Sequence, residues 1–413
     1  MDKELLKEVL LSQAKKPEEK VVERAVLSRI KEHSKTPFII IISGVRRCGK
    51  STVLQEIRNN DCYYVNFDDE RLIQFTVADF QVMHELLMEL FGERNVFIFD
   101  EIQNIKGWER FVRRLYDQKK KIYISGSNAS MLSRELGTHL TGRNISLPMF
   151  PFSFSEYLEF RELPKKTTNI TSAEKSMLKK AYNEYLIEGG FPEYLQTKKE
   201  DYLRNLYENV IYRDVITRYK LSSEKPIKET AYYIASNIGK EISFNSIKKL
   251  TGLTSATTIK EYMEYLENSY LAFLVPKYNS SLKKQIYSAK KVYFIDQCLA
   301  RLLGFRESED RGRMMENAVF LNLKRKNEEI YFHREKNECD FIIRKGGKIT
   351  SAIQVTVSLK ETNREREISG LLEAMKKYKL SKGIIITEDQ TEEIKIDNKK
   401  ISVVPVWKWL LEE

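Results

Sequence analysis

The sequence FIIIISGVRRCGKST, residues 38–52, decides the fold of the first part of the chain. Its apolar, β-branched half predicts a buried strand that ends near Gly44, and the residues after Ser51 predict the start of a helix. Residues 44–51 fit the pattern G-x-x-x-x-G-K-[ST], whose glycines let successive backbone N–H groups surround phosphate oxygens. The helix that follows points its positive N-terminus at the same anion. An ordinary strand–turn–helix that contains a lysine is the alternative, and residues further along the chain decide between the two.

In the phosphate-binding interpretation, the residue types of the loop have separate tasks. Lys50 is expected to reach the β- and γ-phosphates of a nucleotide, and the Ser51 hydroxyl to coordinate Mg²⁺. The residues expected to hold the nucleotide are Gly44, Val45, Arg46, Arg47, Cys48, Gly49, Lys50, Ser51 and Thr52.

An apolar strand that ends in two acids, residues 95–101, is the second signal. Strands alternate with helical segments from residue 36 to about residue 150, which is typical of a parallel sheet in an α/β domain. Asp100 is expected to hold the magnesium ion, directly or through water, and Glu101 to polarise the water that attacks the γ-phosphate. Such strands are common by chance, but one at this distance from a phosphate-binding loop is not.

Two further strands refine this prediction. The strand at residues 121–125 leads to Ser127 and Asn128, which are expected to sense the γ-phosphate or position the water, with simple turn formation as the alternative. One additional strand, residues 63–68, lies in the chain between the loop strand and the acidic strand. Together with Glu101 it favours the additional-strand, catalytic-glutamate ATPases, and no N-K-x-D stands where a GTPase needs it. The expected cofactors are ATP and Mg²⁺.

Short motifs spread along the chain resemble those of one family. They are GVRRCGKS at 44–51, FDEIQ at 99–103, SGSN at 125–128 with MLS at 131–133, LTGR at 140–143, FPFSFSE at 150–156, GGFPEY at 189–194 and YRDV at 212–215. They resemble the prokaryotic AAA-type ATPases with a DUF4143 C-terminal region, which are related to archaeal ATPases of the same branch. The resemblance covers essentially the whole chain and implies ATP binding and hydrolysis.

The resemblance also makes Arg143, just before the last strand, a candidate catalytic contact to the γ-phosphate. The contact would be made within the chain or from a neighbouring subunit, and the second case would imply a homo-oligomer. Pairing of Arg143 with an acidic surface residue is the alternative. Arg213 and Arg218 could also reach phosphate, although an ion pair with Asp214 or Glu208 is the favoured use of either.

The patterns divide the chain into five parts. We expect an N-terminal helical segment (1–35), an AAA-type P-loop ATPase domain of the additional-strand class (36–150) and a helical lid that closes over the nucleotide (151–225). A winged helix-turn-helix (226–300) and a C-terminal restriction-endonuclease-like α/β domain (301–413) follow.

The winged-helix prediction rests on a helix, a Thr-Gly-Leu turn, a second helix and a hairpin between residues 232 and 297. The residues expected to contact DNA are Ser255, Thr257, Thr258 and Lys260 on the second helix and Lys283, Lys284, Lys290 and Lys291 in the wing. The net charge of +11 favours a polyanionic partner such as double-stranded DNA. Glu261, Glu264 and Glu267 on the same helix would repel DNA if they faced it, so a protein-interaction module is the alternative.

The last part resembles a PD-(D/E)xK nuclease core. Glu316 on a helix and Asp340 in a strand match the two acids that hold Mg²⁺ in such nucleases. Where Glu-x-Lys is expected, the chain has Gln354-Val355-Thr356, and threonine cannot supply the cation of the missing lysine. Glu316, Asp340 and Gln354 are therefore expected to form a degenerate site, with an ATP-gated, metal-dependent nuclease as the alternative.

Composition argues against a membrane protein, a secreted protein and a zinc- or disulfide-stabilised fold. The hydrophobic content of 42% suits globular packing, and the longest apolar runs are about one strand long, so no membrane segment, no signal pattern and a cytoplasmic location are expected. Four scattered cysteines support neither a zinc site nor a disulfide framework. The main hypothesis is an ATPase that couples its nucleotide state to a C-terminal DNA-binding module. A nucleotide-switched module that docks a protein at the C-terminal domains is the rival.

Overall fold

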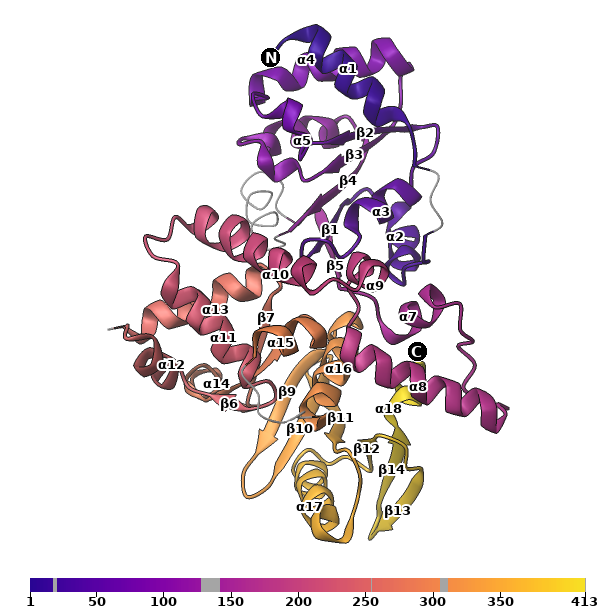
Figure 1. Cartoon of the computed structure of the whole chain (residues 1–413), viewed down its shortest axis with the longest axis vertical. Coiled ribbons are helices and arrows are strands. Elements are labelled where there is room, and N and C mark those ends of the chain that lie inside the picture. The colour runs from indigo at the N-terminus through magenta and orange to yellow at the C-terminus, as the bar shows by residue number, and fades with distance from the viewer. Residues whose placement is uncertain (18–20, 128–141, 254, 305–310, 413) are drawn as a thin grey trace. The chain divides into compact units, whose positions relative to one another are not determined.

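The computed structural model describes residues 1–17, 21–127, 142–253, 255–304 and 311–412 (Figure 1). The chain divides into two compact units, Met1–Phe150 and Pro151–Glu413. No helix among the described residues is long and apolar enough to cross a membrane.

The first unit is an α/β unit built on a parallel sheet of five strands in the order β2-β3-β4-β1-β5. Its strands are β1 (Ile39–Gly44), β2 (Cys62–Asn66), β3 (Val96–Asp100), β4 (Lys121–Gly126) and β5 (Asn144–Met149). Its helices are α1 (Lys3–Ala14), α2 (Val26–Ser34), α3 (Lys50–Glu56), α4 (Phe80–Phe91) and α5 (Trp108–Asp117), with short 3₁₀ turns η1 (Glu70–Leu72), η2 (Val77–Asp79) and η3 (Ile102–Asn104). All four strand pairings are parallel.

The strand order carries the additional-strand topology. The strand inserted between β1 and the acidic strand β3 is β4, whereas β2, the strand expected from the sequence to be the additional one, lies at the sheet edge beyond β3. The choice of β2 as the additional strand is therefore wrong, because order in the chain does not give order in the sheet. The parallel P-loop NTPase sheet predicted from the sequence is therefore present. Because parallel strands end at the same edge, the loop after β1, the acids at the end of β3 and the polar end of β4 share one side of the sheet.

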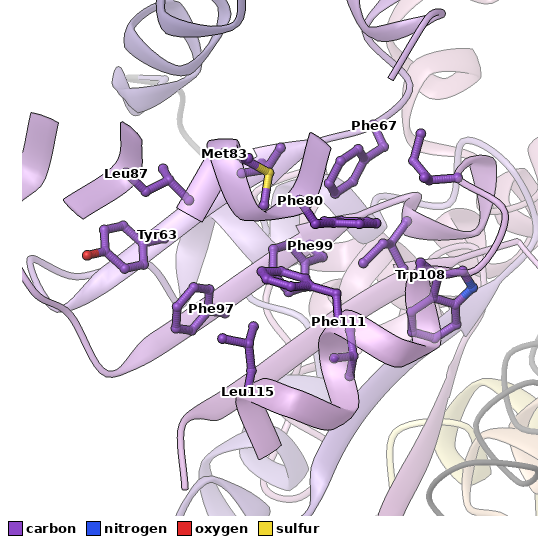
Figure 2. Packing of buried hydrophobic residues seen from close by; sticks show 14 of the residues in the cluster. Tyr63, Phe67, Phe80, Met83, Leu87, Phe97, Phe99, Trp108, Phe111 and Leu115 are labelled. Carbon is purple, nitrogen blue, oxygen red and sulfur yellow. The ribbon is translucent and has the colours of Figure 1, made fainter. Parts of the chain in front are cut away.

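An aromatic core fixes one face of this sheet (Figure 2). Phe97 and Phe99 of β3 point outward from the sheet and meet Phe80 of α4 and Phe111 of α5, whose rings stack with centroids 4.6 Å apart. Leu6, Val9 and Leu10 of α1 join the same core. The predicted scaffold helix at the N-terminus is thus packed on the sheet by its apolar side.

The second unit begins with helices. They are α7 (Phe154–Phe160), α8 (Ser172–Glu188), α9 (Pro192–Thr197), α10 (Glu200–Asn209) and the π-helical segment η4 (Val210–Thr217). Residues 151–225 thus belong to the second unit, and their closure over a nucleotide stays a prediction. Arg218, directly after η4, lies 3.5 Å from Asp214, as the ion-pair interpretation predicts, while Glu208 pairs with Lys228 at 3.0 Å.

Two of the family motifs, FPFSFSE and GGFPEY, pack against each other in this unit. Gly190 accepts a hydrogen bond from the Phe152 backbone at 2.7 Å, and a Cβ at Gly190 would lie 2.4 Å from the Phe152 carbonyl oxygen. The buried Asp296 carboxylate accepts the Gly190 N–H at 2.7 Å and caps a later helix through Cys298. Only glycine permits this close approach.

A segment of four helices and three strands follows. It comprises α11 (Lys225–Ser236), β6 (Glu241–Ile242), α12 (Phe244–Thr251), α13 (Ala256–Asn268), β7 (Ala272–Pro276), α14 (Leu282–Tyr287) and β8 (Lys290–Phe294), with the antiparallel sheet order β6-β8-β7. This order of elements is compatible with the predicted winged helix-turn-helix. The four lysines predicted in the wing lie on the short helix α14, which holds Lys283 and Lys284, and at the start of β8, which holds Lys290 and Lys291.

The chain ends in an α/β segment with a mixed sheet of order β13-β14-β12-β11-β10-β9. Its elements are α15 (Gln297–Leu303), α16 (Arg311–Arg325), β9 (Glu329–Arg334), β10 (Glu338–Lys345), β11 (Lys348–Val355), α17 (Glu361–Lys377), β12 (Lys382–Thr387), β13 (Glu392–Ile396), β14 (Lys399–Pro405) and α18 (Val406–Trp409). The side chain of Asn317 on α16 bonds the backbone N–H and carbonyl of Phe294 on β8 at 2.8 and 3.0 Å. Buried polar contacts thus cross the predicted boundary near residue 300.

Candidate nucleotide site

The two glycines of the loop pattern are each required by local geometry. Gly49 has φ +99°, a backbone conformation that other residues adopt only with strain, and it directly precedes α3. A Cβ at Gly44 would lie 2.1 Å from the Met149 carbonyl oxygen of the neighbouring strand β5. Glycine at these positions lets the chain turn tightly between the end of β1 and the start of α3.

Lys50, the first residue of α3, lies back across this loop. Its ammonium donates hydrogen bonds to the carbonyl oxygens of Gly44 at 3.1 Å and Val45 at 3.2 Å, and it lies 3.5 Å from the Glu101 carboxylate. The side chain is buried. The positive charge of Lys50 is therefore held next to the loop, where a bound phosphate group would contact it.

Asp100, the last residue of β3, is a buried carboxylate surrounded by hydroxyl groups. Ser125 of β4 donates to its Oδ1, and the Tyr64 hydroxyl of β2 donates to its Oδ2 at 3.0 Å. Burial raises the pKa of Asp100 and the neighbouring charge of Glu101 raises it further, while hydrogen bonds with Ser125, Ser51 and Tyr64 oppose the shift.

These donors fit a magnesium ion. Ser51, at the start of α3, acts on the Asp100 carboxyl at the end of β3 and lowers its pKa, so oxygen atoms from α3 and β3 lie on the same side of the sheet. Hydroxyl, carboxylate and phosphate oxygens are the ligands that Mg²⁺ prefers. Ser51 and Asp100 are the residues that would hold it.

Glu101 is held in an uncommon conformation. Its φ of +52° lies in the left-handed region, which for a residue other than glycine carries strain and is frequent in active sites. Its N–H donates to Ser125 Oγ at 3.1 Å, and Gln103 donates to its carboxylate. Burial acts to raise the pKa of Glu101, but the charges of Lys50 and Arg46 outweigh burial and lower it. The group is therefore an ionised carboxylate beside the loop.

Sequence reasoning missed two residues here. Ser125 joins both acids of β3, and its signal was a polar residue inside the otherwise apolar strand β4. Arg24 precedes α2, and its buried guanidinium donates to the carbonyl oxygens of Cys48 at 2.7 Å and Phe150 at 2.6 Å. Arg24 thereby links the loop to the end of β5. The helical pattern of residues 1–35 gave no indication of this contact.

The other predicted contacts of this site differ in their placement. Ser127 is buried directly after β4, and Asn128 lies outside the described residues. Arg143 precedes β5, and its carbonyl pairs with Ile39 at the start of β1, so it lies at the sheet edge opposite to the loop. About five strand residues of ~3.3 Å each separate the two edges.

The prediction that Arg143 contacts the γ-phosphate within its own chain is therefore wrong. Its side chain lies 3.5 Å from Asp117 and over the Tyr116 ring, as the surface-pair alternative predicts. A contact to a neighbouring subunit stays a prediction.

Comparisons with known proteins agree with this geometry. The model of the AAA domain matches residues 36–158, and domains of unknown function, DUF8612 and DUF4143, match residues 179–309 and 311–409. An uncharacterized protein of Methanocaldococcus jannaschii is 36% identical over 90% of this chain and 88% of its own length. The chain belongs to the family of AAA-type ATPases with a DUF4143 C-terminal region.

This AAA-type ATPase has further relatives. An uncharacterized protein of Haemophilus influenzae is 30% identical over 94% of this chain and 97% of its own length. Among solved structures, AMPPCP-bound DnaA from Aquifex aeolicus is 15% identical and covers 60% of this chain and 88% of its own, with a TM-score of 0.26. The predicted family membership is confirmed.

The C-terminal candidates are partly brought together and partly separated. Glu316, Asp340 and Gln354 meet in one buried cluster. The expected DNA contacts differ in exposure: Thr257, Lys260, Lys283 and Lys284 are exposed, whereas Ser255, Thr258 and Lys290 are half-buried.

Lys291 requires a correction. Its side chain is 1% exposed and its ammonium lies among the carboxylates of the nuclease-like cluster, so its prediction as a wing contact to DNA is wrong. Strand alternation explains the error, because successive residues of β8 face opposite sides of the sheet.

Proposed function

We propose that this AAA-type protein is a Mg²⁺-dependent ATPase that releases inorganic phosphate from ATP. The observation that carries the proposal is the ionised Glu101 carboxylate, which lies 3.5 Å from the Lys50 ammonium and is held in place by Ser125 and Gln103. A carboxylate fixed beside a phosphate-binding loop is suited to accept the proton of a water that attacks the γ-phosphate in line.

The other residues of the site supply binding and charge. Lys50 exchanges its loop carbonyl partners for the β- and γ-phosphate oxygens, and Asp100 with Ser51 holds the metal. Mg²⁺ supplies neutralisation of the negative charge that develops on the phosphate oxygens. The choice of ATP over GTP rests on the additional strand β4 between β1 and β3, on Glu101 and on the lack of N-K-x-D in the sequence.

The variant Glu101→Gln tests the proposal. We expect phosphate release to fall by about 10²–10⁴-fold, because the amide cannot take the proton, while binding of a fluorescent ATP analogue stays within about twofold. Glu89→Gln, an exposed carboxylate on α4, is the matched control and should hydrolyse ATP at the wild-type rate. Unchanged hydrolysis by Glu101→Gln would disprove the assigned base.

We further propose that the C-terminal unit binds double-stranded DNA and that the nucleotide state controls this binding. Thr257 and Lys260 on α13 and Lys283 and Lys284 on α14 present exposed donors for phosphate. Of the three acids on α13, Glu267 turns inward and accepts the Leu274 N–H at 2.9 Å, whereas Glu261 and Glu264 are exposed. Two of the three expected repulsive charges therefore remain on the surface.

Salt dependence separates this proposal from the protein-interaction alternative. Each lost phosphate contact lowers the slope of log K against log salt by about 0.9, so the double variant Lys283→Ala/Lys284→Ala should lower it by about 2. The ATPase rate should rise with added double-stranded DNA at low salt and lose that response at high salt. An unchanged rate and no DNA complex even at low salt would instead favour docking of a protein partner.

A further inference from the structure

A second buried lysine lies among carboxylates in the C-terminal unit. The Lys291 ammonium, on β8, lies 2.8 Å from Asp340 Oδ1, 3.1 Å from Glu316 Oε1 and 2.7 Å from Glu338 Oε1. Asp340 and Glu338 come from β10 and Glu316 from α16. The chain therefore does bring a cation to the cluster, from a strand far from the Gln354-Val355-Thr356 stretch in which a lysine was expected.

The oxygens around this ammonium have other partners as well. The Tyr293 hydroxyl donates to Glu316 Oε1 at 2.6 Å, and the Val355 N–H donates to Asp340 Oδ2 at 2.8 Å. A Cβ at Gly239 would lie 2.8 Å from Glu316 Oε2, so the turn before β6 lies directly against that carboxylate. The four-helix, three-strand segment thus covers the cluster.

Gln354 does not complete a metal site. Its Oε1 accepts the Asp340 backbone N–H at 3.2 Å, and its Nε2 donates to Glu367 at 2.7 Å. The amide that replaces the expected carboxylate is therefore bound to its neighbours. Among the described residues of this cluster, Lys291 is the group that neutralises Asp340 and Glu316.

The charge of Lys291 is secured by these neighbours. Burial acts to lower its pKa, but Asp340 and Glu316 outweigh burial and raise the pKa well above its ordinary value. A divalent ion bound to the same oxygens would stand about 2.0–2.6 Å from each of them, in the space that the ammonium fills. Lysine and metal therefore exclude each other.

We propose that the Lys291 ammonium takes the place of the divalent cation in this nuclease-like cluster. In the native protein the cluster binds no Mg²⁺ and cleaves no phosphodiester; instead it fixes β8 to α16 and β10. The four-helix, three-strand segment and the C-terminal sheet consequently act as one body. The inference is independent of ATP hydrolysis at the first unit.

Metal titration of the nucleotide-free, full-length protein tests the exclusion. We expect calorimetry with Mn²⁺ to give no saturable binding at this cluster in the wild type and one added site per chain in Lys291→Ala, because the carboxylates then face an open space. The loop site is identical in both proteins and cancels in the comparison. Wild-type Mn²⁺ binding that disappears in Asp340→Asn would overturn the proposal, and so would a folded Lys291→Ala chain that gains no site.

Thermal unfolding provides a second test, which can be used even if the Lys291→Ala variant folds poorly. Lys291→Met should lower the melting temperature of the C-terminal unit by roughly 10 °C, since it leaves buried carboxylates without a counter-ion. Adding Glu316→Gln and Asp340→Asn should recover most of that loss. Lys290→Met, the half-buried neighbour on β8, should shift melting by less than about 2 °C. A Lys291→Met chain as stable as the wild type would overturn the role as counter-ion.

Plasmid cleavage is a third test of the proposal. We expect no nicking by the wild-type protein with Mg²⁺ or Mn²⁺, with or without ATP. Nicking that is lost in Asp340→Asn would show an active nuclease and overturn the proposal.

Discussion

Each unit of this AAA-type protein contains a buried lysine close to carboxylate oxygen, and the two lysines differ in their partners. Lys50 donates to two loop carbonyls and lies 3.5 Å from one oxygen of Glu101. Lys291 is within 3.1 Å of three carboxylates. The first lysine can exchange neutral partners for phosphate oxygens, whereas the second is already paired with full negative charges.

The difference shows that residue type alone does not define a site. A carbonyl oxygen competes weakly with phosphate for an ammonium group, but a buried carboxylate does not release its counter-ion without a large loss of stability. Lys50 is therefore suited to ligand binding and Lys291 to holding the fold together.

The largest expected effect is that of Lys50→Ala. We expect ATP hydrolysis to fall by about 10³-fold, since the variant loses the cation that meets the β- and γ-phosphates, while melting of the C-terminal unit is unchanged. Phosphate release and calorimetric unfolding measure the two outcomes. Lys3→Ala, exposed on α1, is the control. Wild-type turnover by Lys50→Ala would remove the distinction between the two lysines.

A smaller effect is expected from Gln354→Glu, which restores the carboxylate of the nuclease pattern. We expect the free energy of unfolding of the C-terminal unit to fall by about 2 kcal/mol, because the new carboxylate faces Glu367 and loses the hydrogen bond to it. No plasmid nicking should appear, since Lys291 still fills the cluster. Gln196→Glu, exposed on α9, is the control for denaturant unfolding. A gain of nicking would mean that a metal ion displaces the Lys291 ammonium from the cluster.

Ser125→Ala tests the hydroxyl that joins both acids of the first site. We expect kcat to fall by about 10-fold with little change in KM for ATP, since a hydrogen bond to a charged group contributes about 1.5 kcal/mol or more. Tyr64→Phe removes the other hydroxyl from Asp100 and should act in the same direction. Steady-state kinetics separates the two constants. A change in KM alone would assign Ser125 to nucleotide binding.

The smallest effect is expected from Arg24→Lys. Lysine keeps the charge but cannot reach both carbonyl oxygens with a planar fork, so the loop should be less well fixed. We expect KM for ATP to rise by about threefold to fivefold at unchanged kcat. Lys31→Ala, exposed on α2, is the kinetic control. An equal loss of kcat would show that Arg24 affects the chemical step.

Much of the first site was predictable because its signals are local. The loop pattern and the apolar strand that ends in Asp100 and Glu101 are each a short, contiguous run of residues, and the alternation of strands and helices is visible along the chain. The position of Arg143 was predicted wrongly, because proximity in sequence to the last strand does not say at which edge of the sheet that strand begins.

The sequence by itself determined the phosphate-binding loop, the acidic strand and the α/β class, since contiguous residues with a fixed backbone geometry specify them. Tertiary structure alone decided that Ser125 joins the two acids, that Arg24 braces the loop and that Lys291 enters the carboxylate cluster. These groups come from 24 or more residues away along the chain. Hydrogen bonds and charge pairs act through space, so folding, and not spacing in the sequence, selects the partner of a buried lysine.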